Sequence, residues 1–127
     1  KHVLLDLGEM RALGSKPDGQ PWRIGVRDPG RPEHTLREFD AIDRAVATSA
    51  GTADLNILDP RKGEGGALYS SVTVMTGSAT AADALSTALY LTPPEEVAGL
   101  LAKASPARVL LAGPGGIRVA EYGVDPF

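Results

Sequence analysis

The segment from Ser71 to Leu91 constrains the fold more than any other part of the sequence, because it joins two hydrophobic periods. Residues 71–76 alternate valine with serine and threonine, which predicts a β-strand. From Ala79 to Leu91 the apolar residues recur at helical spacing, and they are Ala81, Ala82, Leu85, Ala88 and Leu89. We therefore expect the strand to deliver the chain into a central amphipathic helix.

The opposite face of this helix carries polar side chains. Asp83 and Thr87 are four residues apart, so their oxygens project from the same face one turn apart. A carboxylate and a hydroxyl in this arrangement can bind Mg²⁺, which prefers oxygen ligands. Two other interpretations stay open. In the first, Thr80 and Asp83 form a capping box, and Asp83 only accepts hydrogen bonds from backbone N–H groups at the helix start. In the second, this face of the helix is simply solvated.

The rest of the chain is predicted to be mainly extended. We expect strands at residues 2–7, 22–27, 35–39, 42–48, 55–58, 108–112 and 117–122. The run at 2–7 is apolar enough for a buried strand, whereas residues 8–14 are predicted to be a turn-rich link and residues 61–67 a glycine-rich loop.

A second helix is predicted directly after the first. Thr92 is expected to be its N-cap, Pro93 its first helical residue and Glu95 the partner that closes a capping box. Its apolar face ends near Ser105 and Pro106. Strands with two adjacent helices, without strict alternation, indicate an α+β fold with a mainly antiparallel sheet in a single domain spanning residues 1–127.

The length, charge and composition of the chain exclude several classes of function. A chain of 127 residues is long enough for one domain with a substantial core. The formal net charge of −3 and scattered basic residues argue against nucleic-acid binding, and no apolar run is long enough to span a membrane. Without cysteine, thiolate catalysis and zinc–cysteine sites are excluded. Because the sequence starts at Lys1 within an apparent strand, we expect it to be part of a longer protein.

Five segments, in order along the chain, resemble motifs of one family. The sequence SSVTVMTGSATAADALSTALYL, residues 70–91, resembles a signature near the family's C-terminus. The other four segments are residues 6–14, 18–29, 45–49 and 57–61. On these residues the chain resembles the ApbE family, the FAD:protein FMN transferases. The resemblance covers the C-terminal half of a typical member and implies a T-fold-like core.

The resemblance also implies a metal site. In this family an aspartate and a threonine bind the metal that neutralises the FAD pyrophosphate, and they correspond to Asp83 and Thr87. The cofactors implied are therefore FAD and Mg²⁺. The implied partners are FAD as donor and an acceptor redox protein with a target threonine. A bacterial protein of the periplasm or cell envelope is implied, with the cytoplasm as the alternative.

A second implied site is the loop at residues 56–63. It resembles a family motif in which Asn56 and Ile57 would contact flavin or adenine through backbone groups, with a simple turn as the alternative. Asn56 replaces the family's histidine, and an asparagine amide cannot act as a general base near neutral pH. No catalytic residue is therefore assigned. This replacement favours an alternative function, that of a degenerate, non-catalytic relative that binds flavin or a protein. A third alternative is a purely structural domain.

Overall fold

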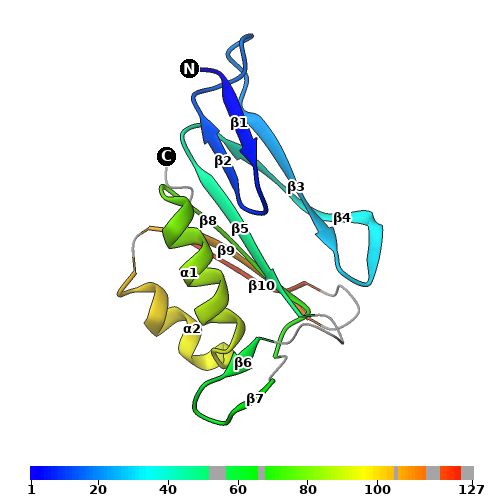
Figure 1. Cartoon of the computed structure of the whole chain (residues 1–127), viewed down its shortest axis with the longest axis vertical. Coiled ribbons are helices and arrows are strands. Elements are labelled where there is room, and N and C mark those ends of the chain that lie inside the picture. The colour runs from blue at the N-terminus through cyan, green and yellow to red at the C-terminus, as the bar shows by residue number, and fades with distance from the viewer. Residues whose placement is uncertain (52–56, 66–67, 105, 114–117, 124–127) are drawn as a thin grey trace.

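The computed structural model describes residues 1–51, 57–65, 68–104, 106–113 and 118–123 (Figure 1). The strands are β1 (Val3–Asp6), β2 (Met10–Leu13), β3 (Trp22–Asp28), β4 (Arg31–Ala41), β5 (Ala45–Ala50), β6 (Leu58–Asp59), β7 (Glu64–Gly65), β8 (Ser71–Thr76), β9 (Arg108–Ala112) and β10 (Arg118–Tyr122). The helices are α1 (Ala79–Tyr90) and α2 (Pro94–Leu101). Neither helix, nor any other in the described residues, is long and apolar enough to cross a membrane.

One antiparallel sheet organises the molecule. Its strand order is β1-β2-β5-β8-β9-β10, and every neighbouring pair is antiparallel. The strands β3 and β4 form a separate hairpin, and β6 and β7 form a short one. This confirms the predicted α+β fold with a mainly antiparallel sheet and two adjacent helices.

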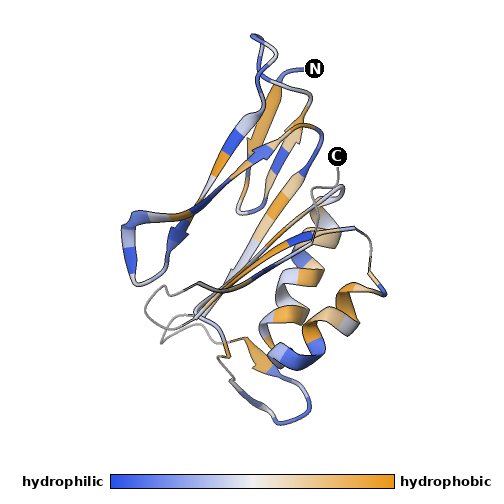
Figure 2. Cartoon of the chain, turned by 180° about the vertical axis from the view of Figure 1, so that it is seen from behind, coloured by the Kyte–Doolittle hydropathy of each residue, from blue (hydrophilic) through white to orange (hydrophobic). Residues whose placement is uncertain are grey.

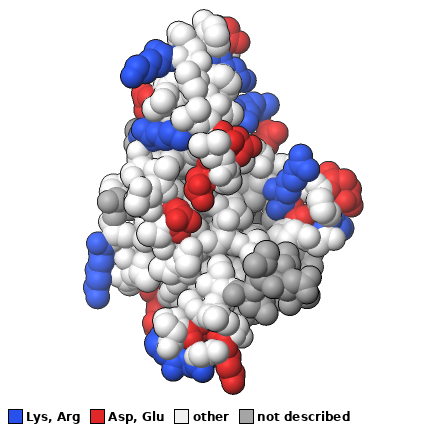
Figure 3. Space-filling view, in the orientation of Figure 1, with Lys and Arg blue, Asp and Glu red and all other residues white. Residues whose placement is uncertain are grey.

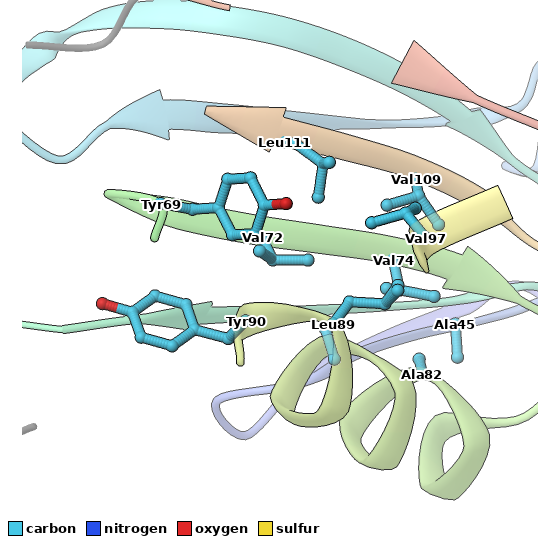
Figure 4. Packing of buried hydrophobic residues seen from close by; sticks show 11 residues of the cluster. Ala45, Tyr69, Val72, Val74, Ala82, Leu89, Tyr90, Val97, Val109 and Leu111 are labelled. Carbon is cyan, nitrogen blue, oxygen red and sulfur yellow. The ribbon is translucent and has the colours of Figure 1, made fainter. Parts of the chain in front are cut away.

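The helices cover one face of the sheet. Figure 4 shows side chains of α1, among them Ala82 and Leu89, pointing toward Val72, Val74 and Ala45 on the strands. We call this cluster the helix-side core: Ala45, Ala47, Tyr69, Val72, Val74, Ala82, Leu89, Tyr90, Val97, Val109 and Leu111. It fixes α1 across β5 and β8, and therefore decides which α1 residues face outward.

The β3–β4 hairpin covers the other face. Side chains of β3 alternate between buried and exposed as predicted, with Ile24 and Val26 inside. The hairpin-side core consists of Ala12, Ile24, Val26, Phe39, Ala41, Val46, Met75 and Leu110. Beyond this contact the hairpin is hydrophilic toward its tip, as the view from behind shows (Figure 2). Because both faces of β8 are covered, all six of its residues are buried, the serine and threonines as well as the valines.

The N-terminal strands differ from the prediction in two ways. Val3–Asp6 forms a strand but is mostly exposed, because β1 lies at the edge of the sheet instead of in its interior. The predicted link at residues 8–14 contains the strand β2, which returns from β1 through a turn at Gly8 with a φ of +110°. Glycine adopts a left-handed φ readily, which explains the turn at this position. The prediction of a turn is therefore right, but the strand that follows it was not predicted.

The start of α2 also differs from the prediction. The N-cap is Pro93, no side chain caps the helix, and Pro94 is the first helical residue. The Thr92 hydroxyl instead donates to the Ala88 carbonyl of α1 at 2.8 Å, so it serves the end of the preceding helix. The last helical residue is Leu101, and the chain continues through turns to Lys103 and Ala104 instead of extending the helix toward Pro106.

Candidate functional site

The start of α1 decides between the interpretations of Asp83. Ser78 is the N-cap, with extended backbone, and its hydroxyl accepts the Ala81 N–H at 3.4 Å. The predicted Thr80–Asp83 capping box is therefore wrong. Asp83 is the fifth residue of the helix, beyond the first turn in which free N–H groups are found. Its carboxylate has no capping role to fill.

Asp83 and Thr87 are both exposed on α1, as the helical spacing predicts. No hydrogen bond or ion pair joins the Asp83 carboxylate to another described residue. Over the helices, Figure 3 shows mainly uncharged atoms, with separate acidic groups and with basic side chains toward the edges of the view. The described residues contain no cluster of three or more His, Cys, Asp or Glu side chains that would enclose a metal.

These two residues fit a magnesium ion by the chemistry of their donors. A carboxylate and a hydroxyl supply hard oxygen ligands, and Mg²⁺ commonly keeps several waters and takes only one or two carboxylates from the protein. The exposed position leaves room for phosphate oxygens and water to complete the coordination. A cation held by these two residues would therefore have a partial, open coordination by the protein and not an all-protein cage.

A group of hydroxyls lies behind Thr87, where β5 meets α1. Ser49 Oγ is 2.8 Å from Ser86 Oγ and 3.2 Å from Thr87 Oγ1. Ser86 Oγ also donates to the Asp83 carbonyl oxygen at 3.0 Å. We call Ser49, Ser86 and Thr87 the hydroxyl cluster. Sequence reasoning did not single out Ser49 or Ser86, because helical spacing says nothing about contacts with a strand.

In the described part of the chain, an ion pair between Asp59 and Arg61 holds the β6–β7 loop. Arg61 donates to both carboxylate oxygens of Asp59 at 2.9 Å from Nε and Nη2, and its backbone N–H also donates to Asp59 at 2.9 Å. These hydrogen bonds, chiefly those of the Arg61 side chain, lower the pKa of Asp59 from 3.8 to about 2. Lys62 and Gly63 donate their N–H groups to the Asp59 carbonyl, which closes the turn.

Of the two predicted flavin-contacting residues, only Ile57 is described. Ile57 is half-buried and packs against the helix-side core. Leu85 of α1 packs against the same core. Asn56 lies outside the described residues. Just beyond Ile57, a pocket of about 220 Å³ opens between the β6–β7 loop and the α1–α2 junction. It is lined by Asp59, Arg61, Lys62, Glu64, Gly65, Leu68, Leu91 and Pro93.

A wider hollow of about 720 Å³ lies on the hairpin side of the sheet. Its charged lining is paired: Arg23 contacts Glu38 at 3.1 Å, and Arg108 contacts Glu121 at 2.9 Å. Neither Asp83 nor Thr87 lines this hollow. Asp83, Thr87 and the pocket beside the β6–β7 loop therefore lie on the helix side of the sheet.

Comparison with known proteins identifies the family. The family profile described as the ApbE family matches residues 1–111, which include all five motifs. This chain belongs to the ApbE family. Over 95 residues it is 34% identical to an FAD:protein FMN transferase from Vibrio cholerae, an alignment that covers 66% of the chain and 28% of that relative.

Solved ApbE structures have the same fold. The chain matches the ApbE protein from Thermotoga maritima with a TM-score of 0.75 and 29% identity, covering 97% of this chain and 42% of that one. It matches the apo form of the Pseudomonas stutzeri flavinyl transferase ApbE with a TM-score of 0.67 and 29% identity, and the match covers 91% of this chain and 39% of that one. This chain thus spans less than half the length of these relatives.

Proposed function

We propose that this ApbE chain is the C-terminal portion of a Mg²⁺-dependent flavin transferase that moves FMN from FAD to a threonine of an acceptor protein. The observation that carries the proposal is the exposed Asp83–Thr87 pair on α1. Its carboxylate has neither a capping role nor a described partner. Membership in the ApbE family and the similarity to the FAD:protein FMN transferase from Vibrio cholerae support the proposal.

The reaction requires one phosphorus–oxygen bond to break and one to form. The threonine oxygen of the acceptor attacks the phosphorus of the FMN half of FAD, AMP leaves with the bridging oxygen, and the threonine proton passes to a base or to water. Bound Mg²⁺ would polarise the pyrophosphate and stabilise the charge that develops on the leaving phosphate. Asp83 and Thr87 would hold that cation at the surface of α1, where a pyrophosphate can reach it.

Calorimetric titration of FAD into the chain tests the proposal. We expect binding in the presence of Mg²⁺, loss of that binding in EDTA, and loss in the variant Asp83→Ala with Mg²⁺ present. A matched control is Glu33→Ala, which removes an exposed carboxylate from the β3–β4 hairpin on the other side of the sheet. Glu33→Ala should bind FAD like the wild type. Absence of binding in every condition, or equal binding by Asp83→Ala, would reject the proposal.

The alternative of a non-catalytic relative is favoured by one specific observation. Asn56 occupies the position of the family's histidine, and its amide does not titrate near neutral pH. Incubation with FAD, Mg²⁺ and a threonine-containing acceptor peptide separates the two functions by mass spectrometry. A transferase adds the mass of an FMN group to the peptide, whereas a flavin-binding relative leaves the peptide unmodified while still binding FAD.

A further inference from the structure

The hydroxyl cluster has one consistent arrangement of protons. The Asp83 carbonyl can only accept, so the single hydroxyl proton of Ser86 is used on it. In the 2.8 Å contact between Ser86 and Ser49, the proton must therefore come from Ser49. Ser49 then has no proton left, so in its 3.2 Å contact with Thr87 the donor must be Thr87.

This assignment rules out one common alternative for a threonine inside a helix. Threonine hydroxyls often donate to the carbonyl four residues earlier, which for Thr87 is that of Asp83. In helical geometry that carbonyl already accepts the backbone N–H of Thr87, and its other lone pair receives the Ser86 hydroxyl. Thr87 is left with Ser49 as its acceptor, and its proton points into the protein.

We infer that Ser49 and Ser86 are positioning residues that orient the Thr87 hydroxyl for cation binding. A hydroxyl binds a cation through an oxygen lone pair, so its proton must point away from the ion. With the proton of Thr87 directed at Ser49, the lone pairs of its oxygen face outward on the same side of α1 as the Asp83 carboxylate. This inference rests on the proposed function, because it concerns the same cation site.

Burial explains why the orientation is stable. Ser86 is 0% exposed and Ser49 is 8% exposed, so water does not replace their mutual hydrogen bond. Thr87 itself is exposed, and without Ser49 its hydroxyl proton would be free to rotate toward solvent. Partners of this kind, which hold a ligand in one orientation, typically change metal affinity by about 10- to 100-fold when removed.

The affinity of the full chain for Mn²⁺ tests the inference, measured by the loss of the free-ion signal in electron paramagnetic resonance. Mn²⁺ accepts the same oxygen ligands as Mg²⁺. We expect Ser49→Ala to weaken Mn²⁺ binding by about 10-fold, the low end of the range for orienting partners. Thr87→Val, which removes the ligand oxygen, should weaken binding at least as much.

The decisive measurement is the double variant Ser49→Ala/Thr87→Val. If Ser49 acts only through Thr87, the double variant binds Mn²⁺ as weakly as Thr87→Val alone. The matched control is Thr48→Val, because Thr48 also bonds a hydroxyl across β5 and β8, at 2.8 Å to Thr73. Thr48→Val should retain wild-type affinity. Urea unfolding in EDTA verifies that each variant is folded, and Ser86→Ala provides a second variant of the same chain of hydroxyls.

The outcomes separate the inference from the proposed function. Wild-type Mn²⁺ affinity in both Ser49→Ala and Ser86→Ala would overturn the inference, while losses in Asp83→Ala and Thr87→Val would leave the cation site standing. Additive effects of Ser49→Ala and Thr87→Val would also overturn it, because Ser49 would then act elsewhere. No Mn²⁺ binding by the wild type would reject the site and the inference together.

Discussion

At the scale of single residues, Asp59 shows how a local pair holds a loop. The residue is nearly buried, at 5% exposure, yet its carboxylate stays ionised because the side chain and the backbone N–H of Arg61 donate to it. The loop that follows Ile57 depends on this carboxylate. Protonation would weaken the hydrogen bonds that Arg61 donates to this carboxylate, so acid should destabilise the loop.

The pH dependence of stability should reveal this carboxylate. The pKa of Asp59 is about 2 in the folded chain and 3.8 ordinarily, so its stabilisation is complete above pH 3.8 and is lost as the pH falls toward 2. Asp28 acts in the same direction, because the Gly30 N–H lowers the pKa of its carboxyl group. We expect the urea midpoint of the wild type to fall over this interval, and that of Asp59→Asn to fall less.

The paired measurement is the urea midpoint at pH 5 and pH 2.5 for the wild type, Asp59→Asn and Asp28→Asn. Both variants should have a smaller drop than the wild type, and the double variant the smallest. An unchanged drop in Asp59→Asn would show that this carboxyl group is not lowered in pKa by its partners.

At the scale of elements, the first turn of α1 illustrates how close alternatives are separated. Ser78 and Thr80 are both suitable N-cap residues, and the sequence pattern favoured Thr80 because Asp83 follows it by three. The structure begins the helix two residues earlier than that capping box requires, with Ser78 in the extended conformation. The consequence for function is direct, since a start at Ala79 leaves the Asp83 carboxylate available.

Alanine substitutions measure which residue caps the helix. Ser78→Ala should lower the free energy of unfolding by about 1 kcal/mol, the usual cost of losing an N-cap. Thr80→Ala should change it by no more than about 0.5 kcal/mol, as expected for an exposed position without a special role. Urea denaturation followed by circular dichroism gives both values. A larger loss in Thr80→Ala than in Ser78→Ala would move the helix start to Thr80.

At the scale of the whole molecule, two cores share one sheet. Val74 and Met75 are neighbours on β8, but one packs in the helix-side core and the other in the hairpin-side core. Loss of packing in either core should therefore destabilise the other, because the same strands contribute side chains to both. A separate unfolding of the helices or the hairpin would expose one whole face of β8, whose residues are all buried. We expect a single cooperative unit.

Two probes on opposite faces can test this cooperativity. Fluorescence of Trp22, the single tryptophan, reports on the hairpin side, and helical circular dichroism reports on the other side. The two urea transitions should coincide in the wild type. Leu89→Ala, in the helix-side core, should lower the free energy of unfolding by about 2–5 kcal/mol and shift both probes equally. A shift confined to the circular dichroism signal would contradict a single unit.

Local patterns in the sequence determined much of the molecule. The alternation in residues 71–76 predicted β8 with its observed bounds, the helical period predicted α1 to within one residue, and the four-residue spacing put Asp83 and Thr87 together on its exposed side. These are properties of neighbouring residues, so no knowledge of the rest of the fold was needed. The motifs likewise pointed to the ApbE family, which the comparisons confirmed.

Only the tertiary structure decided which residues of different elements meet. Ser49 is 37 and 38 residues from Ser86 and Thr87, and its hydroxyl reaches them because the helix-side core fixes α1 against β5. In the same way, the apolar strand β1 became an exposed edge because strand order is set by long-range pairing. Side-chain hydrogen bonds and burial depend on distances between elements, and the packing of the whole chain sets those distances.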